Sequence, residues 1–115
     1  MRKDLLAWQW SLYAAGHRDR VSLLLHIATA PLFWIGTVLI VSAILRGQAG
    51  ALLSGLALWL AALLAQGRGH GREREPPVPF DGPLDFASRF LIEQFVTFPR
   101  FVLSGGWLRA WHAST

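Results

Sequence analysis

The fold of this protein is decided by one uncharged stretch, VSLLLHIATAPLFWIGTVLIVSAIL, which occupies residues 21–45. A second stretch without Asp, Glu, Lys or Arg follows almost directly, at residues 47–67. A helix needs about 20 apolar residues to cross a bilayer core of roughly 30 Å, so each stretch is long enough to span a membrane. We therefore predict transmembrane helices over 21–45 and 49–66, joined by a short connection into an antiparallel hairpin.

Composition supports a membrane protein and excludes several other classes. The chain has 115 residues, of which 53% are hydrophobic, and it contains no cysteine. A soluble domain of this size buries only about 60–68% of its unfolded surface, so this hydrophobicity would leave large apolar patches in water. Without cysteine, disulfide scaffolds, thiolate metal sites and cysteine nucleophiles are excluded. The net charge of +4 lies outside the two neutral stretches, which favours a membrane surface over nucleic acid as the partner.

The distribution of basic residues predicts the orientation. Ten of the eleven Lys and Arg side chains lie before the first stretch or after the second, and only Arg46 lies between them. By the positive-inside rule both termini are then cytoplasmic, which for a bacterial protein means the inner membrane.

The flanking segments predict two further helices. Residues 4–16 are typical of an interfacial helix, with aromatic side chains suited to the headgroup level. Residues 67–84 are rich in charges and prolines and predict a polar loop. Residues 85–104 carry a polar stripe at helical spacing, so we expect an amphipathic helix that lies in the interface or leans on the hairpin, rather than a third span. The expected fold is thus a single all-α integral membrane domain over residues 1–115.

The histidines are the candidate residues for a metal site. In an antiparallel hairpin that turns at residues 47–48, His26 and His70 lie within roughly 2 Å of the same depth, because each residue adds about 1.5 Å. A helix break after Gly16 would let His17 fold back over them, and Glu73 or Glu75 would add a carboxylate. Three imidazoles and a carboxylate suit Fe(II), and zinc accepts the same ligands. The alternative is that these histidines only bond backbone and lipid.

The same residues carry a resemblance to a known family. Tyr13-x3-His17, His26-Ile27-Ala28-Thr29-Ala30-Pro31 and Gln66-x2-Gly69-His70, with Glu73 and Pro77 following, resemble the membrane 2-hydroxy-fatty-acid (2-hydroxypalmitate) dioxygenases, in particular their short bacterial branch. The stretches Phe80-Asp81-Gly82-Pro83 and Glu93-Gln94-Phe95 also resemble that branch.

The resemblance implies an Fe(II)-dependent, O2-consuming α-oxidation that shortens a 2-hydroxy fatty acid by one carbon. It implies His17, His26 and His70 as iron ligands, to which we add Glu73. Tyr13 and Gln66 belong to the shared motifs and become candidate substrate contacts. Arg72 is a third, because a guanidinium suits a fatty-acid carboxylate or a lipid phosphate.

The sequence therefore predicts a lipid or fatty-acid substrate, with its chain along the apolar hairpin. Two rival functions stay open: a non-enzymatic membrane hairpin that serves as a scaffold or complex subunit, and a zinc-dependent membrane lipid hydrolase. Self-association into a homo-oligomer is compatible with all three.

Overall fold

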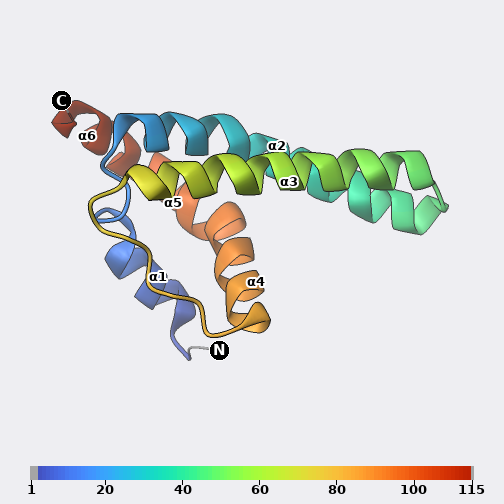
Figure 1. Ribbon diagram of the computed structural model, residues 1–115, viewed down its shortest axis with the longest axis horizontal. Coiled ribbons are helices and arrows are strands. Elements are labelled where there is room, and N and C mark those ends of the chain that lie inside the picture. The colour runs from blue at the N-terminus through green and yellow to red at the C-terminus, as the bar shows by residue number, and fades with distance from the viewer. Residues whose placement is uncertain (1–2, 115) are drawn as a thin grey trace.

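Two long helices form the body of the molecule. The computed structural model describes residues 3–114, and every regular element within them is a helix. Helices α2 (Arg20–Arg46) and α3 (Ala49–Arg72) lie side by side along the long axis, joined at one end by Gly47 and Gln48 (Figure 1). Both are long and apolar enough to cross a membrane. The prediction of an all-helical chain with two such helices is confirmed.

The ends of α2 are fixed by its terminal residues. Asp19 precedes the helix, and its side chain accepts a hydrogen bond from the backbone N–H of Ser22, which satisfies one of the free donors of the first turn. At the other end Gly47 has a φ of 65°, a conformation that glycine adopts without strain. The chain can therefore turn back into α3 after only two residues.

Helix α3 continues six residues beyond its expected end at Gln66, so part of the predicted polar loop is helical. The reason is the packing of Gly69 against α2: a Cβ atom there would lie 2.9 Å from Ser22 Oγ. This close contact between the helices stabilises the helical conformation of residues 67–72. The three glycines of this segment would otherwise disfavour that conformation. As a result His70 stands on a helix, and the irregular connection is confined to residues 73–82.

The remaining helices gather at the end where α2 begins and α3 finishes. They are α1 (Leu5–Tyr13), α4 (Pro83–Ile92), the π-helix η1 (Glu93–Thr97), α5 (Phe98–Leu103) and α6 (Gly106–Ala113). Figure 1 shows α1 and α4 extending to one side of the α2–α3 pair, whereas the half of the pair near its connection projects alone.

The single helix predicted over 85–104 is instead three consecutive helical segments. Its middle turn is wide, since the backbone N–H of Phe98 bonds to the carbonyl of Glu93, five residues earlier. Pro99 follows and offers no N–H for the ladder, which favours such an irregularity. After Gly105, whose φ is 83°, α6 forms a helix that the sequence analysis did not predict.

In α4 and η1 the polar side chains face inward and large apolar side chains face outward, the opposite of a soluble protein. Asp85, Arg89, Gln94 and Thr97 are at most 7% exposed, whereas Phe95 and Leu84 are 46% and 68% exposed. The predicted polar stripe is therefore buried only in its first part, because Arg100 and Ser104 of its last part are exposed and Phe98 and Phe101 are buried there instead.

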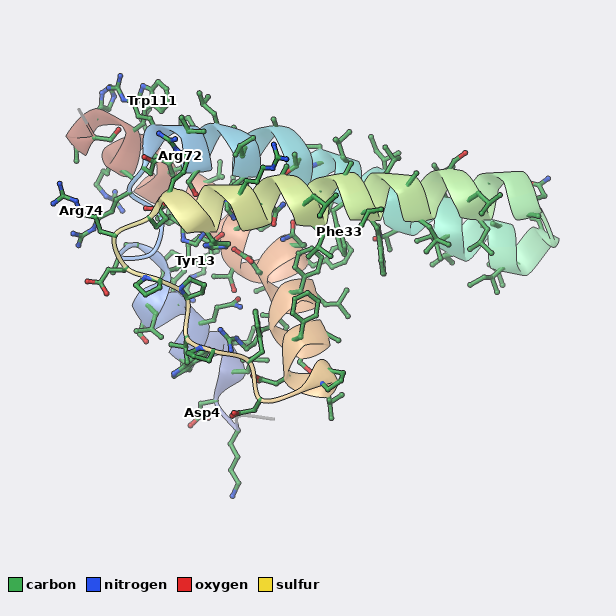
Figure 2. The ribbon with its side chains drawn as sticks, in the orientation of Figure 1. Asp4, Tyr13, Phe33, Arg72, Arg74 and Trp111 are labelled. Carbon is green, nitrogen blue, oxygen red and sulfur yellow. The ribbon has the colours of Figure 1, made fainter. Side chains whose placement is uncertain are left out.

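Many of the apolar side chains of α2 and α3 also face outward. In the most apolar stretches of α2 and α3, only 28% and 17% of the residues are buried. Apolar side chains stand out along both helices (Figure 2), including Val38, Ile44, Leu45, Leu53 and Leu64, each more than half exposed. Their contact with each other is made by small residues: a Cβ atom on Gly55 would lie 2.7 Å from the backbone oxygen of Gly36.

Candidate metal centre

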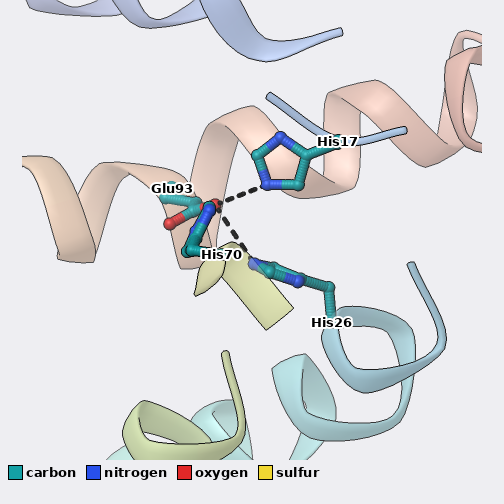
Figure 3. Close-up of side chains that lie close together, drawn as sticks. All are labelled: His17, His26, His70 and Glu93. Carbon is teal, nitrogen blue, oxygen red and sulfur yellow. Dashed lines mark ion pairs between the residues drawn. The ribbon is translucent and has the colours of Figure 1, made fainter. Parts of the chain in front are cut away.

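Three histidines and one glutamate converge near the ends of α2 and α3. They are His17, His26, His70 and Glu93, and one nitrogen or oxygen atom of each lies within 4.8 Å of all the others. Figure 3 shows the four side chains turned toward one another. The ring centroids of His26 and His70 are 4.8 Å apart, and those of His17 are 4.8 and 5.1 Å from these two. The expected meeting of distant imidazoles at one depth is therefore present.

Each histidine comes from a different segment. His17 lies in the connection between α1 and α2, directly after a turn at residues 14–16 that follows the end of α1 at Tyr13. His26 stands on the second turn of α2 and His70 near the end of α3. Because α2 and α3 are antiparallel, these two positions lie at the same end of the pair.

The backbone fixes the orientation of two of the rings. The Nδ1 atom of His17 lies 2.8 Å from the carbonyl oxygen of Tyr13, and that of His26 lies 2.9 Å from the carbonyl oxygen of Ser22. A carbonyl can only accept, so Nδ1 carries the proton in both rings and Nε2 presents its lone pair. Both Nε2 atoms are buried without a hydrogen-bond partner in the part of the chain that the structure describes. This is the arrangement that orients imidazoles as metal ligands.

Glu93 supplies the negative charge of the group. Its Oε2 atom lies 3.4, 3.7 and 4.0 Å from the Nε2 atoms of His17, His26 and His70. Burial raises the pKa of this carboxyl, but contact with the His17 ring and the positive charge that the three imidazoles carry when protonated outweigh it, and the pKa falls to about 2. Within residues 3–114 no Lys or Arg forms an ion pair with it. Its countercharge must come from protonated imidazole or from a cation.

Tyr13 holds the carboxylate in place. Its hydroxyl donates to Glu93 Oε2 over 2.8 Å, and its ring stacks on His17 with 3.8 Å between centroids. Burial raises the pKa of Tyr13, and the charge of Glu93 and the hydrogen bond to it raise the pKa further, so the phenol remains a donor. Expected as a substrate contact, Tyr13 is therefore a direct neighbour of the metal-binding group.

Buried amides fasten the π-helix that carries Glu93. Gln94 and Gln66 form a reciprocal pair: the amide of each donates to the oxygen of the other, over 2.6 and 3.0 Å. Gln66 also donates to Thr29 Oγ1, and Thr97 donates to Gln9 on α1. The wide turn of η1 lets Glu93, Gln94 and Thr97 all face inward, a use of π-helical geometry that recurs at functional sites. Gln66, another expected substrate contact, is hydrogen-bonded within the protein and also lines the apolar cavity beside the four residues.

Glu73 does not belong to the group, so the expected carboxylate ligand is corrected to Glu93. The Oε1 atom of Glu73 instead accepts hydrogen bonds from the backbone N–H groups of Arg18 and Asp19, over 2.8 and 2.9 Å. These bonds hold the connection that carries His17 against the end of α3. Glu75, the alternative considered with it, is also outside the four residues.

An apolar cavity of about 270 Å³ opens beside the four residues. His17, His70 and Glu93 line one part of it, and apolar side chains line most of the rest: Trp8, Leu12, Leu63, Val78, Phe80, Phe86 and Phe90. Its walls are one face each of α1, α3 and α4, closed by residues 75–80.

A buried arginine fixes that closing segment. Arg89 donates to the carbonyl oxygens of Val78 and Pro79 and pairs with Asp85 over 3.2 Å. Its guanidinium lies 4.0 Å from the ring centroid of Phe80. Arg72, by contrast, pairs with Asp19 at the outer surface and does not line this cavity. Its expected role in substrate contact therefore has no support here.

The donor set fits a first-row transition metal. The spread of 4.8 Å is little more than twice a metal–ligand bond of about 2.1 Å, so small side-chain rotations would close the group on an ion. Two unpartnered imidazole nitrogens and a charged carboxylate are ligands that iron, zinc and related ions accept, and the geometry leaves the identity of the ion open. A site with protein on one side and an apolar cavity on the other can admit a small molecule next to the ion.

The comparisons with known proteins add no relative. The chain matched no protein-family model, no characterised protein and no solved structure.

Proposed function

We propose that this protein is a membrane-embedded non-haem Fe(II) dioxygenase that shortens 2-hydroxy fatty acids by one carbon. One observation carries the proposal: the unpartnered Nε2 atoms of His17 and His26 meet His70 and Glu93 at the wall of an apolar cavity. The resemblance of the histidine motifs to 2-hydroxy-fatty-acid dioxygenases selects iron and the substrate from the chemistry that such a site permits.

The proposed reaction balances with O2 as the only oxidant. The substrate RCH(OH)COOH and O2 give RCOOH, CO2 and H2O. The bond between the carboxyl carbon and the hydroxyl-bearing carbon breaks, the organic carbons lose four electrons, and O2 takes them up. Bound Fe(II) would supply O2 activation and a chelation point for the hydroxyl and carboxylate oxygens of the substrate.

The residues of the chain would bind and orient the reactants. His17, His26, His70 and Glu93 hold the ion, and Tyr13 keeps the Glu93 carboxylate turned toward it through its hydroxyl. The apolar cavity, which α3 of the hairpin helps to line, receives the acyl chain that is expected along the apolar hairpin. The segment that Arg89 anchors covers one side of the cavity.

The membrane position is part of the proposal. Outward-facing apolar side chains on α2, α3 and α4 support spans in lipid, and the bias of basic residues supports cytoplasmic termini in the inner membrane of a bacterium. A fatty-acid substrate dissolved in the bilayer would then reach the cavity without crossing water.

The decisive experiment measures metal and turnover on one detergent-purified sample. We expect close to one iron per chain after anaerobic loading, and O2-dependent conversion of 2-hydroxypalmitate to pentadecanoate. Glu93→Gln should lose iron and turnover, because it removes the only carboxylate of the group. Glu73→Gln is the matched control: it keeps both, because Glu73 bonds only backbone N–H groups.

Other outcomes identify the rival functions. Zinc in the purified chain together with O2-independent lipid hydrolysis would show the hydrolase. A chain that binds neither metal and retains its helices would show the scaffold. Equal iron contents in Glu93→Gln and Glu73→Gln would contradict the assigned ligand set.

A further inference from the structure

A second hollow lies on the other side of the histidine-bearing connection, and its lining is basic. It has a volume of about 920 Å³, and five arginines line it: Arg18, Arg20, Arg72, Arg74 and Arg109. They come from the connection before α2, the first turn of α2, the end of α3 and the residues after it, and α6. Figure 2 shows Arg72, Arg74 and Trp111 together at the end of the molecule where α3 finishes.

The hollow keeps a positive charge after its internal pairs are counted. Two carboxylates line it, those of Asp19 and Glu73, which leaves three positive charges of the five. Asp19 pairs with Arg72, and Glu73 accepts from backbone N–H groups. Within residues 3–114, the remaining positive charge therefore resides on guanidinium groups that neither carboxylate of this hollow neutralises.

Two of these guanidiniums point to an external ligand. Within residues 3–114, the side chains of Arg18 and Arg74 form no hydrogen bond or ion pair, and both are exposed. Arg20 and Arg109, by contrast, donate to backbone carbonyls of α6 and of the turn before it. Arg18 and Arg74 are thus available donors at the mouth of an otherwise organised basic hollow.

The position of the hollow selects the ligand. It lies at the end of α2 and α3 where, on the membrane placement of the proposed function, the lipid headgroups begin. Aromatic side chains frame it at that level: Arg20 lies 4.4 Å from the ring centroid of Trp111, and Arg100 lies 4.0 Å from that of Trp10. Guanidinium groups bind phosphate oxygens through paired N–H donors. We infer that this hollow binds the headgroup phosphate of an anionic phospholipid.

Such a lipid would have a definite effect on the metal centre. The hollow and the cavity share Tyr13 as a lining residue, and the connection that carries His17 forms the wall between them. A headgroup between Arg18 and Arg74 would hold this connection against the end of α3, beside the bonds that Glu73 already makes. Anionic lipid is therefore expected to stabilise the end of the molecule that holds His17.

The test counts lipids on the full-length chain. Native mass spectrometry of detergent-purified protein, titrated with phosphatidylglycerol or with phosphatidylcholine, should show preferred binding of one phosphatidylglycerol. The double variant Arg18→Gln/Arg74→Gln should weaken that binding about thirtyfold, since each basic side chain near an anionic surface contributes roughly a factor of five. Arg18→Lys/Arg74→Lys keeps the charges and should retain most of the preference.

A matched control separates a site from general charge attraction. Arg46→Gln removes one positive charge at the opposite end of α2 and should leave phosphatidylglycerol binding unchanged. Equal binding of the two lipids, or an equal loss in Arg46→Gln and the double variant, would overturn the inference. Displacement of the lipid by inorganic phosphate or glycerol 3-phosphate at comparable concentration would also overturn it, because the site would then recognise a soluble anion.

The iron content of the same samples distinguishes failure of the headgroup site from failure of the proposed enzyme activity. The double variant should still load iron, since neither arginine is among the four ligands. Lipid preference without iron would contradict the enzyme proposal alone, and iron without lipid preference would contradict the headgroup site alone.

Discussion

At the scale of single residues, the local backbone orients two imidazoles of the candidate metal centre. His17 and His26 each donate from Nδ1 to the carbonyl oxygen four residues earlier. The tautomer that a metal needs is therefore selected by helical or near-helical backbone rather than by a distant side chain. Glu93 depends on a distant partner instead, because Tyr13 reaches it from α1.

The first prediction concerns that partner. Tyr13→Phe keeps the ring that stacks on His17 and removes only the hydroxyl that donates to Glu93. Loss of an outer-shell hydrogen bond typically weakens metal affinity by 10- to 100-fold, and we expect about tenfold here. Competition with a chelator of known affinity measures it. Ser11→Ala is the control, because that exposed hydroxyl bonds only the carbonyl of Trp8; equal affinities in the two variants would contradict the role given to Tyr13.

The residues that sequence could predict at the site are those whose depth follows from the hairpin. His26 and His70 follow from counting outward from the turn, and His17 from the break after Gly16. Glu93 was missed because its distance from the hairpin depends on how α4 and η1 fold back, which no local periodicity encodes. A signal was available: a polar stripe on a Phe-rich helix of a membrane protein is expected to face inward, toward other polar groups.

At the scale of elements, the packing of α2 on α3 depends on glycines that lie in contact. Gly36 and Gly55 bring the two backbones together in the half of the pair that no other helix covers, and Gly69 does so beside the metal centre. In lipid, helix association gains little from burying apolar side chains, so such close contact is a principal source of stability.

The second prediction compares two glycines of α3. A Cβ atom on Gly55 would lie 2.7 Å from Gly36 O and from Ile40 Cγ1, whereas a Cβ atom on Gly50 would have no neighbour within 4 Å. Gly55→Ala should therefore lower the free energy of unfolding by about 1–3 kcal/mol. Gly50→Ala should leave it unchanged or raise it by up to about 1 kcal/mol. Thermal unfolding in detergent checks both, and a similar loss in the two variants would exclude close packing as the cause.

The helix boundaries that sequence misplaced have specific physical causes. The run of glycines after Gln66 has low helix propensity and predicted a loop, but contact between Gly69 and Ser22 keeps it helical. The π-helix and α6 were missed because one depends on a carbonyl five residues from its donor and the other on a left-handed Gly105. Both features depend on the conformation of one or a few backbone positions. The spacing of polar and apolar residues carries no information about such positions.

At the scale of the whole molecule, many large apolar side chains of α2 and α3 face outward, as they do in helices that cross a membrane. The interior holds buried imidazoles and amides, the Asp85–Arg89 pair and a small apolar core that includes Leu23 and Phe33, while many Leu, Ile and Val side chains lie on the outside. A soluble domain of this size buries only about 60–68% of its unfolded surface, so exposure of so many apolar side chains to water would be costly. A bilayer would remove that cost, because its interior is as apolar as the side chains that would face it.

The third prediction tests this placement. Val38 is 68% exposed on α2, and Val38→Arg would put a charge into lipid at a cost of up to about 3 kcal/mol. We expect a clear fall in the fraction of chain that resists alkaline extraction from membranes. Gln48→Arg, in the exposed connection between the helices, should not change that fraction. If both variants stayed fully in the soluble fraction, as surface substitutions of a water-soluble protein would, the membrane placement would be wrong.

The origin of the four ligands in separate segments has a consequence for assembly. An ion held by His17, His26, His70 and Glu93 would act as a cross-link between both arms of the hairpin and the helices on either side of it in sequence. Bringing these four distant segments together costs conformational entropy. The binding free energy of a single ion could offset this cost in place of many weaker contacts. Insertion of the hairpin would come first and metal capture second, with the terminal helices settling around the ion. Without the metal, the hairpin would then be inserted while the terminal helices remain undocked. Proteases can recognise and degrade such a form.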